Sequence, residues 1–179
     1  MRSITLPGAV LLFASILSAL PASVANADPQ KKEYLSEAEA DKIREAGATG
    51  PRIVLFENFA SDRIKKLQYE FAHLDPTDQK RTERLNSLIN GYTGCIDDAA
   101  DLIEIGIEKQ QDIRDGVKAM QAGIKEFLPY LQDLALKGPE HETYKTNLED
   151  AIEATQDAAK DLEKASKGAS APPVRRKPS

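Results

Sequence analysis

Apolar residues recur at every third or fourth position along most of the chain, which is the spacing of one face of an α-helix. The first long stretch with this spacing starts near Arg52, and its apolar face consists of Phe56, Ala60, Ile64, Leu67, Phe71 and Leu74. Residues 53–56 alone also suit a strand, but the helical phase continues through them. We therefore predict a helix that ends at Asp75 and Pro76.

A shorter helix is predicted before this one, over residues 36–46. Ser36 and Glu39 have the spacing of a capping box, in which each side chain bonds the other residue's backbone amide. Gly47 is a natural stop signal, and Pro51 suits the first turn of the helix that follows.

The longest periodic stretch, residues 78–136, predicts one long helix that bends near Pro129, a residue with no amide hydrogen to donate. Its polar run 108–112 contains no Gly, Pro or Asn and so lacks turn chemistry. The alternative is a turn near Gln110, which would divide the stretch into two helices of ordinary length. The apolar face consists of Leu85, Leu88, Tyr92, Ile96, Ala99, Ile103, Ile107, Ile113, Val117, Met120, Ile124, Phe127, Leu131 and Leu134.

A break at residues 137–140 separates this stretch from a last helix that ends at Lys167 and Gly168. The apolar and small residues of this helix have a heptad-like, coiled-coil spacing, which indicates close packing against another helix. They are Tyr144, Leu148, Ala151, Thr155, Ala158, Leu162 and Ala165. The Pro-containing basic tail, residues 167–179, lacks apolar bulk and is predicted to be disordered.

These elements predict an all-α fold, an antiparallel helical bundle or hairpin stack with a long central helix. The bundle domain spans residues 36–166, and residues 28–35 form a flexible N-terminal segment. Each helix has one apolar stripe and needs a neighbour to cover it. A single very long helix would leave part of its stripe uncovered, and from this we infer a possible homodimer.

The first 27 residues have the pattern of a secretory signal peptide. Arg2 is followed by a continuous apolar run, residues 9–20, and then by Pro21 and a small-x-small motif that ends at Ala27. We expect cleavage after Ala27 and a periplasmic or secreted product. No later stretch is apolar for long enough to insert stably into a membrane.

The charge of the chain argues against nucleic-acid or anionic-membrane binding. The 179 residues have a net charge of −5, and residues 28–166 contain 19 Lys and Arg against 29 Asp and Glu, a net charge of −10. The single cysteine, Cys95, excludes an intramolecular disulfide framework. We interpret it as a buried thiol beside the apolar stripe, with an intermolecular disulfide as the alternative.

Candidate catalytic or cofactor chemistry is sparse. Glu70 and His73 form one Glu-x-x-His pair, whereas a di-iron bundle uses two such pairs and two further Glu. A metal- or haem-binding bundle that uses Glu70, His73, His141 or Met120 is therefore a weak alternative. No nucleophile motif, phosphate-binding loop or covalent haem motif occurs, so we expect no enzyme activity and no cofactor.

A run of acidic residues is the best candidate contact surface. Asp97, Asp101, Glu104 and Glu108 are spaced by four, three and four positions, and Asp112 and Asp115 follow them. This spacing places carboxylates on one helix face, where they are either simply solvated or contact a basic partner.

The chain resembles an uncharacterised family of exported α-helical bacterial proteins. The resemblance is carried by residues 34–39, 43–46, 52–56, 59–64 and 148–155. It implies an all-α exported protein, and it assigns no activity and no functional residue. We therefore favour a non-enzymatic interaction or scaffold module with an unidentified protein partner. The alternatives are a periplasmic chaperone-like stress protein, whose splayed helices would expose apolar grooves, and the metal- or haem-binding bundle.

Overall fold

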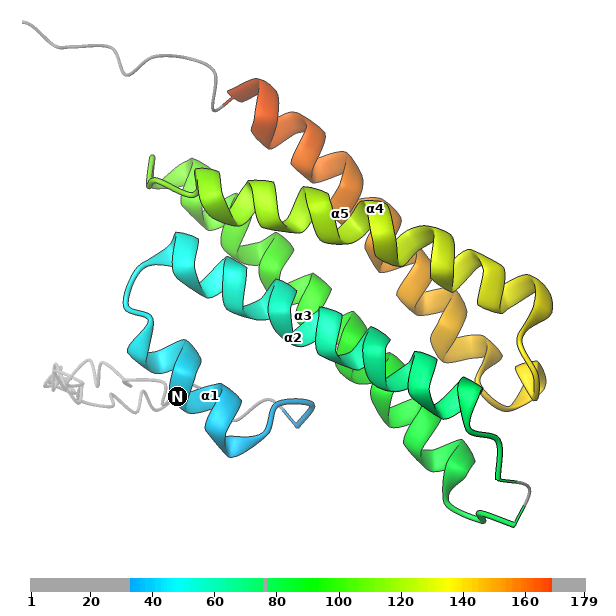
Figure 1. Cartoon of the computed structure of the whole chain (residues 1–179). Coiled ribbons are helices and arrows are strands. Elements are labelled where there is room, and N and C mark those ends of the chain that lie inside the picture. Colours follow the sequence, from blue (N-terminus) through cyan, green and yellow to red (C-terminus); the bar gives the residue numbers. More distant parts are fainter. Residues whose placement is uncertain (1–32, 76, 169–179) are drawn as a thin grey trace, which may run out of the picture. The chain divides into compact units, whose positions relative to one another are not determined.

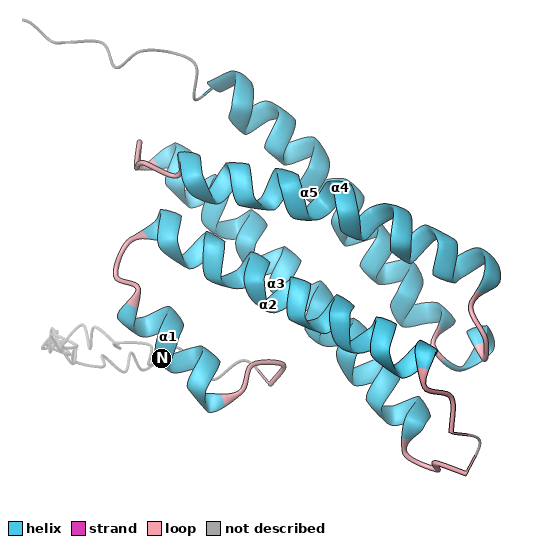
Figure 2. Cartoon of the chain, in the orientation of Figure 1, coloured by secondary structure: helices cyan, strands magenta, loops and turns pink. Residues whose placement is uncertain are grey.

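A computed structural model describes residues 33–75 and 77–168, and the regular structure of these residues is helical throughout (Figures 1 and 2). The all-α prediction is therefore confirmed. The predicted signal peptide, residue 76 and residues 169–179 lie outside the described residues. The helices are α1 (Glu37–Glu45), α2 (Thr49–Ala72), α3 (Arg81–Glu108), α4 (Arg114–Lys137) and α5 (Lys145–Gly168), with a 3-10 turn, η1 (His141–Thr143), before α5.

Helices α2 to α5 form a stack of two antiparallel hairpins. Helix α2 packs against α3 and α4, and α5 packs against the same two helices, whereas α3 and α4 scarcely touch each other. The consecutive helices α3 and α4 therefore lie on a diagonal of the bundle. In Figure 1, α2 and α4 run in one direction and α3 and α5 in the other.

The prediction of one long helix over residues 78–136 is wrong, because the chain turns between α3 and α4. Gln110 has a left-handed backbone, with φ of 52°. The amide of Gln111 donates to the carbonyl oxygen of Gly106 at 2.8 Å, and that of Gln110 to Ile107 at 3.1 Å. This is the hydrogen-bond pattern of a Schellman motif, which usually places Gly at the left-handed position. Gln occupies it here, so the sequence has no turn signal.

Folding back at Gln110 places both halves of this stretch in one bundle, where α2 and α5 cover the apolar stripes of α3 and α4. Ile113 is buried, and a Cβ atom at Gly106 would lie 2.5 Å from its Cγ2 atom, so the chain after the turn packs directly on α3. The stripe that suggested a homodimer is thus covered within the chain. Pro129 lies on the exposed side of α4, which continues past it to Lys137.

The predicted apolar stripes form the core of the bundle. All seven residues of the predicted seam of α5 are buried. The Tyr92 hydroxyl of α3 lies 2.8 Å from the Thr155 hydroxyl of α5, so the buried polar groups of this seam satisfy each other. Two predicted stripe residues are exposed instead, Leu74 by 55% and Ile107 by 48%. Leu74 follows the end of α2, and Ile107 lies in the last turn of α3.

Helix α1 begins and ends as predicted. The Ser36 hydroxyl accepts from the Glu39 amide at 3.3 Å, and the Glu39 carboxylate accepts from the Ser36 amide at 2.9 Å. Gly47 follows the helix with φ of 65°, a conformation that glycine adopts without steric cost. No residue of α1 itself is buried, although Leu35, immediately before its cap, is only 7% exposed. Tyr34 and Leu35, at the end of the segment expected to be flexible, pack onto the bundle.

Candidate protein-interaction surface

The six predicted contact residues lie on the surface around the C-terminal half of α3 and the turn that follows it. All six are exposed, and we call this set the acidic surface. Asp97, Asp101, Glu104 and Glu108 lie on one face of α3, as their helical spacing predicts. Asp112 is in the turn, and Asp115 is in the first turn of α4.

Three of the six carboxylates of the acidic surface have no ion-pair partner among the described residues. Asp101, Glu104 and Glu108 form no ion pair with any residue that the structure describes. The Asp112 carboxylate pairs with Arg114 at 2.7 Å. The hydrogen bonds from the Arg114 side chain lower the pKa of Asp112 to about 2.

The placement of these carboxylates opposes the stability of α3. The carbonyl groups at a helix C-terminus carry partial negative charge, so cations are favoured there and anions are not. Helix α3 has no basic residue in its last turn, and that turn contains Glu108. The like-charged pair Glu104 and Glu108 is also four residues apart, a spacing that destabilises a helix by roughly 0.2–0.5 kcal/mol.

Two large apolar side chains are exposed among these acids. Ile105 is 37% exposed and Ile107 is 48% exposed, and both belong to the last turns of α3. Isolated exposed apolar residues are common on protein surfaces. Here they accompany unneutralised charge, so this end of α3 offers a partner both apolar and electrostatic contacts.

A buried polar cluster, which the sequence pattern did not predict, lies beside the acidic surface. Asp98 is only 8% exposed, and its carboxylate accepts a hydrogen bond from the Tyr34 hydroxyl. Arg63 of α2 is 7% exposed and donates through Nη2 to Glu39 Oε2 at 2.9 Å and to the Tyr34 carbonyl at 3.2 Å. The one available signal was that Arg63 lies in the apolar phase of α2, where a charged residue needs a partner.

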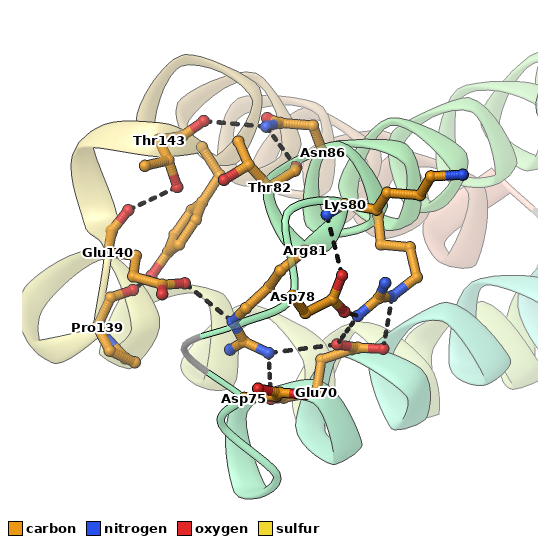
Figure 3. A network of polar contacts seen from close by, with 12 residues as sticks. Glu70, Asp75, Asp78, Lys80, Arg81, Thr82, Asn86, Pro139, Glu140 and Thr143 are labelled. Atoms are coloured by element: carbon orange, nitrogen blue, oxygen red, sulfur yellow. Dashed lines mark hydrogen bonds and ion pairs between the residues drawn. The ribbon is translucent and has the colours of Figure 1, made fainter.

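A second buried arginine joins three segments at the opposite end of α3 (Figure 3). Arg81 Nε donates to Glu140 Oε2 at 2.9 Å, and its Nη1 donates to the Glu70 carbonyl at 2.7 Å. Arg84 forms two further bonds of 2.9 Å to the Glu70 carboxylate. The network connects the end of α2, the start of α3 and the segment before η1, which indicates a structural role.

The four weak metal candidates have different surroundings in the structure. The Glu70 carboxylate is occupied by the two arginines. His73 is exposed, its ring stacks on Tyr69 and its Nδ1 lies 2.9 Å from the Tyr69 carbonyl oxygen. Met120 is in the bundle core, and His141 lies in η1. Over residues 33–75 and 77–168, no three His, Cys, Asp or Glu side chains gather closely enough to hold a metal ion.

A shallow hollow of about 450 Å³ lies between α2 and α3. It carries no nucleophile–base pair, and two of its three cations are already paired: Lys66 with Asp62 at 2.7 Å and Arg84 with Glu70 at 2.9 Å. Its lining consists of Lys65, Lys66, Tyr69, Glu70, Arg84, Ser87 and Leu88.

Comparisons of the chain with protein-family models, with curated proteins and with solved structures give no match. Among the helices that the structure describes, none has both the length and the apolar character required to cross a membrane.

Proposed function

We propose that the chain is an exported, non-enzymatic interaction module that binds a basic protein partner through the acidic surface. The observation that carries this proposal is the set of exposed carboxylates of Asp101, Glu104 and Glu108. They have no ion-pair partner among the described residues, and they oppose the helix dipole at the C-terminal end of α3. Local arrangements that reduce stability without an internal compensation are typical of functional surfaces.

A cationic partner would remove the electrostatic cost of this arrangement. Lys or Arg side chains placed beside Asp101, Glu104 and Glu108 would neutralise repulsion between neighbouring acids and interact favourably with the last carbonyl groups of α3. Complementary charge of this kind speeds association and selects against acidic partners. Ile105 and Ile107 would supply the apolar contacts that such an interface also needs.

The proposal of export rests on the pattern of residues 1–27, and the remaining composition agrees with it. An excess of acidic over basic residues keeps a bundle soluble at high concentration. Cys95 is fully buried, so its thiol is shielded in an oxidising compartment. The chaperone-like alternative requires splayed helices, whereas the apolar stripes of α2 to α5 face one another.

The test compares two variants with the same change in net charge. The first variant carries Asp101→Asn, Glu104→Gln and Glu108→Gln on the acidic surface. The control carries Glu149→Gln, Asp150→Asn and Glu153→Gln on α5, where these three acids are also exposed. Each purified full-length protein is used to capture partners from a periplasmic extract, and the affinity for the recovered partner is measured at several salt concentrations.

We expect the surface variant to bind the partner at least about tenfold more weakly at low salt, because three charge contacts are lost. The control should bind within about threefold of the wild type, and raising the salt concentration should reduce the difference between them. Equal binding by the two variants would contradict the proposal. So would recovery of the same proteins from extract without the bait.

A further inference from the structure

The segment before α1 occupies a fitted site on the bundle. We call residues 34–39 the strap and Arg63, Gly91, Gly94 and Asp98 the strap site. The Tyr34 ring lies directly over Gly94, where an added Cβ atom would be only 2.6 Å from a ring carbon. Leu35 is 7% exposed, so the strap also buries an aliphatic side chain. A glycine at position 94 is therefore needed for this close approach.

The strap site contacts three chemical groups of the strap. Asp98 accepts a hydrogen bond from the phenol of Tyr34. Arg63 Nη2 donates to the backbone carbonyl of Tyr34 at 3.2 Å and to the carboxylate of Glu39 at 2.9 Å. The side chains of both site residues are buried, so a loss of the strap would expose or strand charged groups that it now satisfies.

The strap and α1 are connected to the rest of the chain by a short hinge. Helix α1 has no fully buried residue, and it contacts the bundle through Glu39, which belongs to the strap, and through the half-buried Ile43. The hinge, residues 46–48, reverses the chain through the left-handed Gly47, with φ of 65°. The contacts of the strap site described above involve residues 34, 35 and 39 and no residue of the hinge.

We propose that the strap site is a self-recognition site that binds the strap of a second copy of the chain. A second copy carries the same phenol, aliphatic side chain and carboxylate in the same order. Reciprocal exchange would therefore recreate every contact twice and change only the hinge. The proposal is independent of the acidic surface, because none of the six acids of that surface belongs to the strap site.

The chain's own strap and the strap of a second copy compete for the strap site, and their effective concentrations decide which one binds. A short linker gives the chain's own strap an effective concentration in the millimolar range, so at micromolar concentrations the wild type binds its own strap and is monomeric. A hinge that cannot reverse removes this advantage, and exchange then becomes the way to fill the site. Short or rigid hinges favour domain swapping for this reason.

The test uses the full chain with Gly47 and Ala48 deleted, which joins α1 directly to α2. We expect a dimer by sedimentation and light scattering at about 200 µM, well below the effective concentration of a short linker, whereas the wild type stays monomeric. Adding Tyr34→Ala or Gly94→Leu to the deletion variant should restore the monomer. Adding Tyr69→Ala, the same chemical change at an exposed tyrosine outside the site, should leave the dimer intact.

A second measurement tests the same site without altering the hinge. A fluorescent peptide of residues 33–46 is titrated into the full chain carrying Tyr34→Ala and Glu39→Ala, in which the internal strap is disabled. We expect saturable binding that Gly94→Leu weakens at least about tenfold, since the added side chain occupies the seat of the tyrosine ring.

Three results would overturn the proposal. One is a deletion variant that is helical by circular dichroism yet monomeric at the same concentration. Another is a dimer that persists when Tyr34→Ala is added. The third is the absence of peptide binding up to about 1 mM, which is the effective concentration of the chain's own strap. If the peptide binds but the deletion variant stays monomeric, the site accepts such segments in trans without self-exchange, and the proposed dimer is wrong.

Discussion

The carboxylate of Glu39 accepts hydrogen bonds both from the cap of its own helix and from a buried arginine of α2. Its Oε2 atom accepts from the Ser36 amide at 2.9 Å, which caps α1, and from Arg63 Nη2 at 2.9 Å, which neutralises a guanidinium buried in α2. The folding of α1 and its attachment to the bundle are therefore coupled through one side chain.

Replacing Glu39 with Gln should lower the free energy of unfolding by about 1.5–3 kcal/mol, because a charge-assisted hydrogen bond is lost and Arg63 stays buried. Urea unfolding followed by circular dichroism measures the change. Glu45→Gln is the matched control, since Glu45 is exposed on the same helix and should change stability by less than about 0.5 kcal/mol. Equal effects of the two substitutions would show that Arg63 does not depend on Glu39.

The same pair should contribute a defined dependence of stability on pH. Hydrogen bonding from Arg63 lowers the pKa of Glu39 from 4.5 to about 2 in the folded chain. A lowered folded-state pKa stabilises the fold above the unfolded-state pKa, and this contribution disappears as the pH falls through the folded-state value. Between pH 5 and about 2 the wild type should therefore lose more stability than Glu39→Gln. Thermal unfolding of both proteins across this range measures the difference, and parallel curves would contradict it.

Glu57 should contribute a pH dependence of stability that is opposite in sign to that of Glu39. Its carboxylate is half-buried between α2 and α4, and burial raises its pKa. It forms no hydrogen bond with another residue that the structure describes. A raised folded-state pKa means that the favourable contribution is present at low pH and is lost as the pH rises through that value.

Substitution of Glu57 with Gln should consequently stabilise the protein at pH 7, by a few tenths of a kcal/mol because solvent screens a half-exposed group. The gain should shrink between pH 7 and pH 4, because protonation of the wild-type carboxylate removes the cost of burying its charge. Glu163→Gln, an exposed position on α5, is the control and should be neutral at both pH values. A destabilised Glu57→Gln protein at pH 7 would exclude an electrostatic penalty at this site.

Local pattern was sufficient for the parts of the fold that depend on periodicity and end signals. Ser36, Glu39 and Gly47 begin and end α1 as predicted, and the apolar spacing assigns the core of α5. The turn at Gln110 was not predictable in this way, because a non-glycine residue holds the left-handed position and the reason for turning is coverage of the stripe by a distant segment. The strap site depends on contacts between residues far apart in sequence, such as Tyr34 and Asp98, 64 positions apart.

The turn between α3 and α4 should become more stable when Gln110 is replaced by Gly. A left-handed backbone costs a residue with a side chain roughly 1 kcal/mol, and glycine avoids this cost. Some of the gain is offset by the greater freedom of glycine in the unfolded chain, so we expect a net increase of about 0.5 kcal/mol. Gln111→Gly should instead be neutral or destabilising, because Gln111 does not have a positive φ. Differential scanning calorimetry of the two variants tests this reversal.

Neutralising the acidic surface should change stability and binding in opposite directions. The variant with Asp101→Asn, Glu104→Gln and Glu108→Gln removes like-charge repulsion and unfavourable dipole interactions at the end of α3, so its free energy of unfolding should rise by about 0.5–1 kcal/mol at low salt. The α5 control with Glu149→Gln, Asp150→Asn and Glu153→Gln should gain less than half of this. Salt should reduce the gain of the surface variant, because these charges are exposed.

Measuring both stability and binding for the surface variant separates a binding role of the acids from a structural one. If the acids of α3 served to hold the bundle together, their removal would weaken both the fold and any complex. If they serve a partner, the isolated protein becomes more stable while the complex becomes weaker, which is the trade-off typical of functional surfaces. Urea unfolding of the free proteins and the affinity for the captured partner, measured on the same preparations, decide between the two. A surface variant that unfolds more easily than wild type would assign the acids to the fold and remove the main support for the proposed function.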